Sequence, residues 1–127
     1  MKRILAIDDD LFAREFYRYL LEAEGWVVET APNGEEGLAR FREGGFDLVI
    51  LGLFVHGLDG PGLVRELDPE VSGIPLVAIF DTDAPGAADP LHLALTLGAD
   101  RAFPKSFDYR DLVEAVRELL AGAAAAA

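Results

Sequence analysis

Short apolar runs alternate with helix-like patterns along the chain. Apolar residues recur at helical spacing between these runs, as Phe12, Phe16, Leu20 and Ala23 do, and glycines stand where helices should end. The runs that are short and apolar enough to be buried strands lie at residues 4–7, 26–30, 48–51, 76–80 and 101–103. This alternation predicts a single α/β domain in which helices cover both faces of a parallel sheet.

Local signals mark where several helices begin. Asn33 and Gly34 predict a turn before the second helix. Pro61 suits the first turn of a short helix, and Asp108 can cap the last one. The inner face of that last helix should hold Leu112, Val113, Val116, Leu119 and Leu120.

The segment at residues 91–97 is ambiguous. Its strict alternation of apolar residues fits a strand, whereas the order of elements favours a helix. In a helix, Leu91 and Leu95 would lie on one face and Leu93 and Leu97 nearly opposite, so one pair would need cover. An exposed apolar strip often marks an interface, and we therefore expect a homodimer or partner contact here.

Composition excludes several classes of function. The chain has no cysteine, which leaves no disulfide or thiolate chemistry. A net charge of −12 argues against binding to nucleic acid, whose phosphates need Lys and Arg. No apolar run approaches the roughly 20 residues of a membrane-spanning helix, and the N-terminus does not resemble a signal peptide. We expect a cytoplasmic protein with one domain at residues 1–121, followed by an Ala-rich tail at 122–127 that is a frayed helix end or a linker stub.

Candidate chemistry lies just after the predicted strands, because the sites of open α/β sheets form at the carboxyl ends of the strands. Asp8 and Asp9 follow the first strand, Gly52 the third, Phe80 ends the fourth, and Lys105 follows the fifth. Adjacent carboxylates repel one another and favour a cation. Two carboxylates on a loop suit Mg²⁺ when water and a further oxygen ligand complete its shell.

From residue 2 to about 120 the chain resembles the receiver domain of bacterial two-component response regulators. The resemblance implies a flavodoxin-like (βα)5 three-layer sandwich, with a five-stranded parallel sheet in the order 2-1-3-4-5. It also implies protein partners such as a kinase, an output domain or a second copy. The stretches that carry it are RILAIDDD at 3–10, APNGEEGL at 31–38, FDLVIL at 46–51, GLDG at 57–60, IPLV at 74–77 and GAD at 98–100.

Receiver domains carry a phosphate on an aspartate that ends the third strand. An acidic pair holds Mg²⁺, a lysine contacts the phosphate, and a Thr or Ser on the fourth strand senses it. By this resemblance Asp8 and Asp9 match the acidic pair and Lys105 matches the lysine. The resemblance therefore places the remnant of a phosphorylation pocket at these residues.

Three positions depart from that pattern. Gly52 falls on the phosphoacceptor position, Phe80 on the Thr or Ser position, and Ala102 where a switching Tyr or Phe usually stands. Acyl-phosphate formation needs a carboxylate nucleophile, which glycine lacks. We therefore expect no enzymatic activity, no required cofactor, and at most weak Mg²⁺ binding by Asp8 and Asp9.

The remaining pocket residues should rearrange around the missing carboxylate. We expect Phe80 to lean over Gly52 and Lys105 to turn toward Asp8, Asp9 or Asp81. The alternative is that Phe80 swings outward and leaves an open, hydrated acidic cleft.

The leading functional hypothesis is a pseudo-receiver, a phosphorylation-independent protein-interaction module in signal transduction. Two alternatives stay open. One is a phosphorelay receiver that takes phosphate on another aspartate, such as Asp81 or Asp83. The other is a small-ligand binder that reuses the cleft at the strand ends, because one fold can host many functions.

Overall fold

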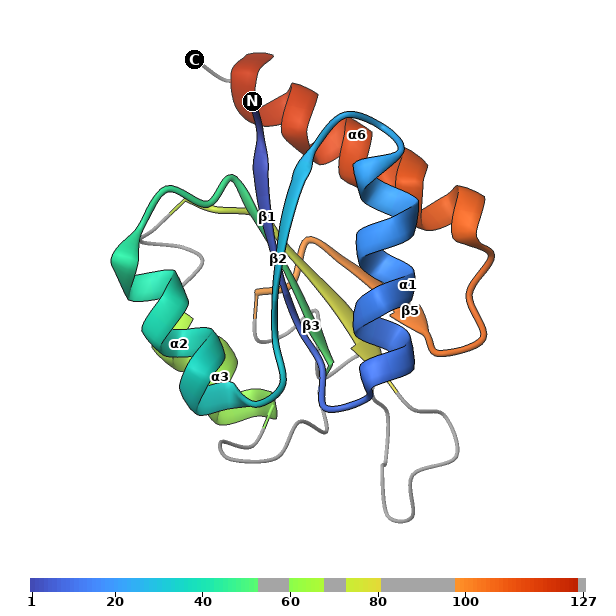
Figure 1. Cartoon of the computed structure of the whole chain (residues 1–127). Helices are drawn as coiled ribbons and strands as arrows, with labels where there is room; N and C mark the ends of the chain where they lie inside the picture. The colour runs from blue at the N-terminus through green and yellow to red at the C-terminus, as the bar shows by residue number, and fades with distance from the viewer. Residues whose placement is uncertain (53–59, 68–72, 81–97, 126–127) are drawn as a thin grey trace.

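The computed structural model describes residues 1–52, 60–67, 73–80 and 98–125 of the chain (Figure 1). The predicted interface residues Leu91, Leu93, Leu95 and Leu97, and the alternative phosphoacceptors Asp81 and Asp83, lie outside these residues. The elements are β1 (Arg3–Ile7), α1 (Leu11–Glu22), β2 (Val27–Ala31), α2 (Gly34–Glu43), β3 (Leu48–Gly52), α3 (Gly60–Leu67), β4 (Leu76–Phe80), β5 (Arg101–Pro104) and α6 (Tyr109–Ala125).

The five strands form one parallel sheet in the order β2-β1-β3-β4-β5, which confirms the predicted topology. Every residue of the inner strands β3 and β4 is buried, because helices cover both faces of the sheet. Helices α2 and α3 lie on one face and α1 and α6 on the other (Figure 1). The result is the three-layer sandwich that the sequence predicts.

The core has two halves because alternate strand residues point to opposite faces of the sheet. Leu5, Val49 and Ala78 face the α2–α3 layer, whereas the neighbouring Ile4 and Ile50 face the α1–α6 layer. The second half includes most of the predicted inner face of α6, where Leu112, Val116 and Leu120 are buried.

Side-chain caps set where the helices begin. Asn33 accepts a hydrogen bond from the Glu36 N–H at 2.8 Å, so it caps α2, and Gly34 is the first residue of the helix rather than part of a separate turn. Asp108 accepts from the Arg110 N–H at 2.9 Å, which confirms the predicted cap of α6. α6 continues to Ala125, beyond the predicted domain boundary at residue 121.

The inner face of α1 differs from the one that the spacing of Phe12 and Phe16 suggests. These two side chains are 85% and 41% exposed, whereas Tyr17 and Leu21 are buried against the sheet. The helix has apolar residues on two faces, so periodicity alone does not fix which face turns inward. In the observed rotation the Tyr17 hydroxyl donates a hydrogen bond to the Asp8 carboxylate at 3.2 Å.

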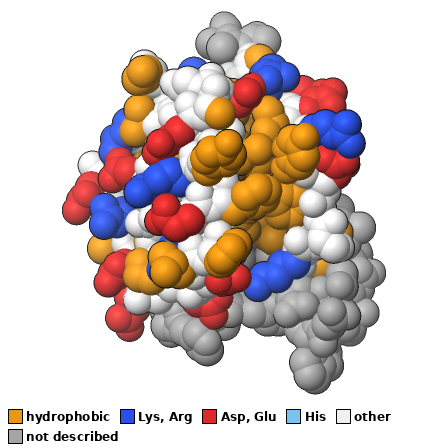
Figure 2. Space-filling view, turned by 45° about the vertical axis from the view of Figure 1, so that its right-hand side comes forward, with side chains coloured by type: hydrophobic (Ala, Val, Ile, Leu, Met, Phe, Trp, Pro, Cys, Tyr) orange, Lys and Arg blue, Asp and Glu red, His pale blue; other side chains and the backbone are white. Residues whose placement is uncertain are grey.

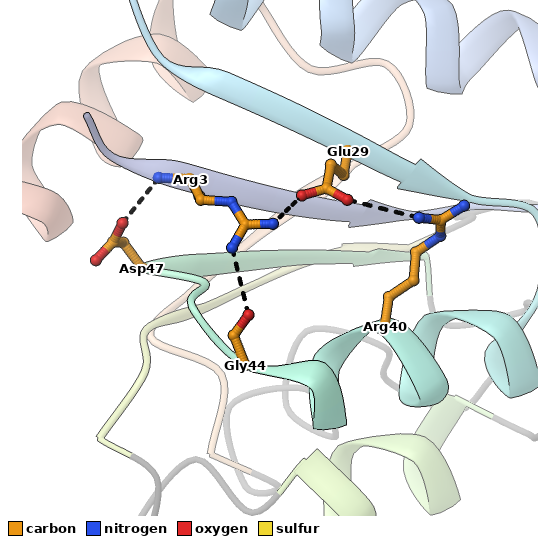
Figure 3. Close-up of polar contacts among 5 residues, drawn as sticks. All are labelled: Arg3, Glu29, Arg40, Gly44 and Asp47. Atoms are coloured by element: carbon orange, nitrogen blue, oxygen red, sulfur yellow. Dashed lines mark hydrogen bonds and ion pairs between the residues drawn. The ribbon is translucent and has the colours of Figure 1, made fainter.

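Arg3 joins three elements at the edge of the sheet where the strands begin (Figure 3). Its guanidinium pairs with Glu29 of β2 and donates to the Gly44 carbonyl after α2 at 3.3 Å, while Arg40 of α2 reaches Glu29 at 3.5 Å. The Arg3 N–H donates to Asp47 at 2.8 Å. This network supports the edge of the sheet opposite the candidate site.

Candidate functional site

The carboxyl ends of the parallel strands bring four of the predicted site residues to one edge of the sheet. Asp8 follows β1, Gly52 ends β3 and Phe80 ends β4. The chain continues from β5 into Lys105, whose N–H donates to the Phe80 carbonyl at 2.9 Å. Residues far apart in the sequence therefore meet here, as the order of strands requires.

Asp8 is buried, with only 2% of its surface exposed, and both of its carboxylate oxygens are engaged. Oδ1 accepts from the Asp10 N–H at 3.0 Å, and Oδ2 accepts from the Tyr17 hydroxyl at 3.2 Å. The Asp8 carbonyl accepts from Arg14 at 2.8 Å. Through these hydrogen bonds Asp8 links α1 to the end of β1.

Burial raises the pKa of Asp8, because a charged carboxylate loses its hydration. The Asp10 N–H, the positive charge of Lys105 and the Tyr17 hydroxyl oppose that rise, and the neighbouring Asp9 adds to it. Burial, followed by the charge of Asp8, also raises the pKa of Tyr17, so Tyr17 stays a neutral donor.

Sequence reasoning missed Tyr17 as a member of the site. The available signal was its hydroxyl on an otherwise apolar inner face of α1, because a buried hydroxyl needs a partner. That signal becomes readable only when the rotation of α1 is known. Tyr17 and Leu21 then share the buried face, and Asp8 is the acceptor within reach.

The two members of the acidic pair lie in different environments. Both Asp8 oxygens already accept hydrogen bonds, and the Asp9 side chain is exposed. Among the described residues, no three His, Cys, Asp or Glu side chains lie close enough together to hold a metal ion. The expectation that Asp8 and Asp9 bind Mg²⁺ weakly at most stays a prediction.

Lys105 is exposed and acts on Asp8 through its charge. Within the part of the chain that the structure describes, no hydrogen bond or ion pair joins the Lys105 ammonium to Asp8. The orientation predicted for Lys105, toward Asp8, Asp9 or Asp81, stays a prediction.

Phe80 is part of the core, with only 7% of its surface exposed. It shares the α2–α3 half with Leu51 and Leu63, and Ala102 of β5 packs against the same cluster. The outward orientation of Phe80 is therefore wrong. The strand register pairs Gly52 with Ile79, and coverage of Gly52 by the Phe80 ring stays a prediction.

Together, Phe80 and Ala102 place a large side chain on β4 and a small one on β5. The β4–β5 register pairs Ala78 with Ala102 and Phe80 with Pro104, so positions 80 and 102 are diagonal neighbours on one face. An aromatic side chain reaches across such a diagonal. The two residues therefore belong to the same half of the core.

Comparison with known proteins gives a consistent result. The response regulator receiver domain profile matches residues 4–117. The transcriptional regulatory protein CpxR homolog of Haemophilus influenzae is 36% identical over 120 residues, which cover 94% of this chain and 51% of that protein. The probable transcriptional regulator ycf27 of Cyanophora paradoxa is 36% identical over 119 residues, covering 94% of this chain and 48% of that protein. The chain thus spans about half the length of these curated relatives.

Solved structures agree in fold. A CheY-like receiver domain protein of Methanospirillum hungatei superposes with a TM-score of 0.88 at 28% identity, covering 100% of this chain and 99% of the other. The response regulator TrrA of Thermotoga maritima, solved in complex with Mg²⁺ and BeF, gives a TM-score of 0.79 at 33% identity, covering 94% of this chain and 99% of the other. No helix among the described residues is long and apolar enough to cross a membrane. By fold, strand order and sequence, this chain belongs to the receiver domain family of two-component response regulators.

Proposed function

We propose that this receiver domain signals without aspartyl phosphorylation, as a protein-interaction module. The observation that carries the proposal is Gly52, which is buried at the end of β3 where the family pattern calls for the phosphoacceptor aspartate. Glycine offers no oxygen nucleophile, and an acyl phosphate forms only on a carboxylate. The domain then has no phosphotransfer chemistry at that position and needs no cofactor.

The surroundings of Gly52 support this proposal. The Asp8 carboxylate is buried and serves as an acceptor for Tyr17 and for the Asp10 N–H, which leaves it poorly suited to Mg²⁺. Phe80 brings no hydroxyl to the end of β4 and is packed in the core. We expect Mg²⁺ to bind weakly if it binds at all.

The partners follow from the family. The similar proteins are transcriptional regulators about twice as long as this chain, so a kinase, an output domain or a second copy is the expected class of partner. A cytoplasmic location is in keeping with that class. The signal would then depend on whether the partner is present rather than on phosphate.

Phosphorylation can be tested directly with acetyl phosphate and Mg²⁺, followed by intact-mass measurement and peptide mapping. We expect no phosphoryl group on the wild-type chain. The matched variants are Gly52→Asp and Gly52→Asp with Phe80→Thr, each checked for folding by circular dichroism. The double variant should be modified more than the single one, because position 80 then carries the hydroxyl that the family pattern places beside the phosphate.

Each opposite result has a distinct meaning. A phosphoryl group mapped to Asp81 or Asp83 of the wild-type chain would replace the proposal with the phosphorelay alternative. Equal modification of the single and double variants would show that a hydroxyl at position 80 does not assist modification at position 52.

A further inference from the structure

Three hydrogen-bond donors from α1 and its N-cap converge on Asp8. The Asp10 N–H donates to Asp8 Oδ1 at 3.0 Å, and the Tyr17 hydroxyl donates to Oδ2 at 3.2 Å. The Arg14 guanidinium donates to the Asp8 backbone carbonyl at 2.8 Å. Arg14 and Tyr17 are three positions apart, so they lie on the same face of α1. Each oxygen of Asp8 therefore has a donor from within the chain.

The donor on Oδ2 competes with any cation for that oxygen. Mg²⁺ and Mn²⁺ both take oxygen ligands at close range, and a carboxylate oxygen is the ligand that Asp8 offers them. The hydroxyl hydrogen of Tyr17 and a cation at Oδ2 both carry positive charge, so they repel one another. Because only 2% of the surface of Asp8 is exposed, there is little space around this oxygen for both.

Packing of the Tyr17 ring holds its hydroxyl at the carboxylate. The ring stacks on Phe107, with centroids 6.5 Å apart and an interplanar angle of 18°. Phe107 in turn packs against Phe103 at 6.2 Å and Phe16 at 6.3 Å, distances typical of aromatic pairs. Figure 2 shows hydrophobic side chains gathered on the side of α1 and α6, and Tyr17 itself is buried. Moving the hydroxyl away from Asp8 therefore requires a packed, buried ring to move.

We propose that Tyr17 closes Asp8 to divalent cations, because its hydroxyl occupies the carboxylate oxygen that a cation would need. Helix α1 supplies the hydroxyl, and the contact with Phe107 keeps it in place. Tyr17 is thus a specificity-determining residue of the pocket at the strand ends. The inference rests on the proposed function, which expects weak Mg²⁺ binding, and it names the residue responsible. Cation binding and phosphorylation are measured separately, so the two proposals can fail independently.

Removal of the hydroxyl alone tests the proposal. Mn²⁺ is the probe, because it takes the same oxygen ligands as Mg²⁺ and broadens the NMR signals of nearby amides. Titration of Mn²⁺ into the isotope-labelled full chain gives both the affinity and the location. Tyr17→Phe should bind Mn²⁺ at least about tenfold more tightly than the wild type, which corresponds to about 1.4 kcal/mol. The broadening should centre on residues 8–10.

Thermal melts give a second readout that does not depend on a paramagnetic ion. A ligand that binds only the folded state raises the melting temperature. Mg²⁺ should therefore raise the melting temperature of Tyr17→Phe more than that of the wild type. The same melts without Mg²⁺ verify that each variant folds.

Two further variants show whether the gain belongs to Asp8. Tyr19→Phe is the matched control, because it removes a hydroxyl from the same helix at a side chain that is 80% exposed, and it should leave Mn²⁺ binding unchanged. Adding Asp8→Asn to Tyr17→Phe should abolish the gain. This second variant separates binding at Asp8 from general attraction of cations by a chain with a net charge of −12.

Phe107→Leu tests the same closure if Tyr17→Phe does not fold. It keeps the hydroxyl of Tyr17 and removes the ring that holds it, so Mn²⁺ should bind more tightly than to the wild type. An affinity equal to that of the wild type would contradict the proposed closure.

Three results with Tyr17→Phe would overturn the proposal. The first is a Mn²⁺ affinity equal to that of the wild type, which leaves the proposed function standing if the wild type takes no phosphoryl group. The second is an equal gain on Tyr19→Phe, and the third is a gain that survives Asp8→Asn. A phosphorylated wild type, together with the expected gain on Tyr17→Phe, would instead reject the proposed function and support closure by Tyr17.

Discussion

Exchanging the sizes of the side chains at positions 80 and 102 should reveal strong energetic coupling between β4 and β5. Phe80 is 7% exposed, and Ala102 packs partly buried against the same cluster. Phe80→Thr removes most of a buried ring, which costs about 3–5 kcal/mol by analogy with Phe→Ala substitutions. Ala102→Phe alone adds a ring to a filled core and costs about 1–3 kcal/mol.

The double variant should be more stable than the sum of these costs implies. The new ring at position 102 can occupy the volume that Phe80 leaves, because the two positions are diagonal neighbours on one face of the sheet. We expect a favourable coupling free energy of at least about 1 kcal/mol, within the range seen for residues in contact.

Urea denaturation followed by circular dichroism measures this coupling. The four proteins of the cycle are the wild type, the two single variants and the double variant, and each gives a free energy of unfolding. A domain of this kind has about 5–15 kcal/mol of stability, so Phe80→Thr should remain measurable at low temperature. If the cost of the double variant equals the sum of the two single costs within about 0.5 kcal/mol, the inference that the side chains at positions 80 and 102 share a volume is wrong.

Further predictions concern Asp8 and two glycines. Burial raises the pKa of Asp8 above 3.8, so the ionised carboxylate lowers stability at neutral pH, and this cost fades as the pH falls through the folded-state pKa. Asp8→Asn should therefore be more stable than the wild type at pH 7, on the order of 1 kcal/mol, with a smaller difference at acidic pH in urea titrations; a constant or opposite difference would contradict this. A Cβ on Gly37 would lie 2.5 Å from Cδ1 of Ile7, so Gly37→Ala should cost about 1–3 kcal/mol. Gly122→Ala, a helical control with no atom within 4 Å of the new Cβ, should instead stabilise by about 0.5–1 kcal/mol, and similar melting temperatures for the two variants would contradict the argument.

The strands were predictable because β3 and β4 are buried along their whole length and leave uninterrupted apolar runs in the sequence. The cap at Asp108 was predictable because its hydrogen bond is local, whereas Asn33, predicted as part of a turn, is the cap of α2. The rotation of α1 was not predictable from the sequence, because its exposed stripe of Phe12, Phe16 and Tyr19 is as apolar as its buried face.

Local sequence patterns also could not predict the environment of Asp8. Its bond to Tyr17 depends on that rotation, and its burial depends on packing between β1 and α1. A groove between α1 and α6 joins segments about 90 positions apart, such as Glu24 and Arg117, which hydrogen bond across 93 positions of the sequence. Local spacing carries no information about such a pair.

The large residue at position 80 and the small one at 102 also restrict how sequences of this kind evolve. A descendant that gained a carboxylate at position 52 would still need a small hydroxyl at position 80, and that replacement alone opens a cavity. Enlarging position 102 first crowds a filled core. Whichever position changes first, the intermediate protein is less stable, and selection tends to remove it. Drift therefore leads away from a phosphorylatable domain more readily than it leads back.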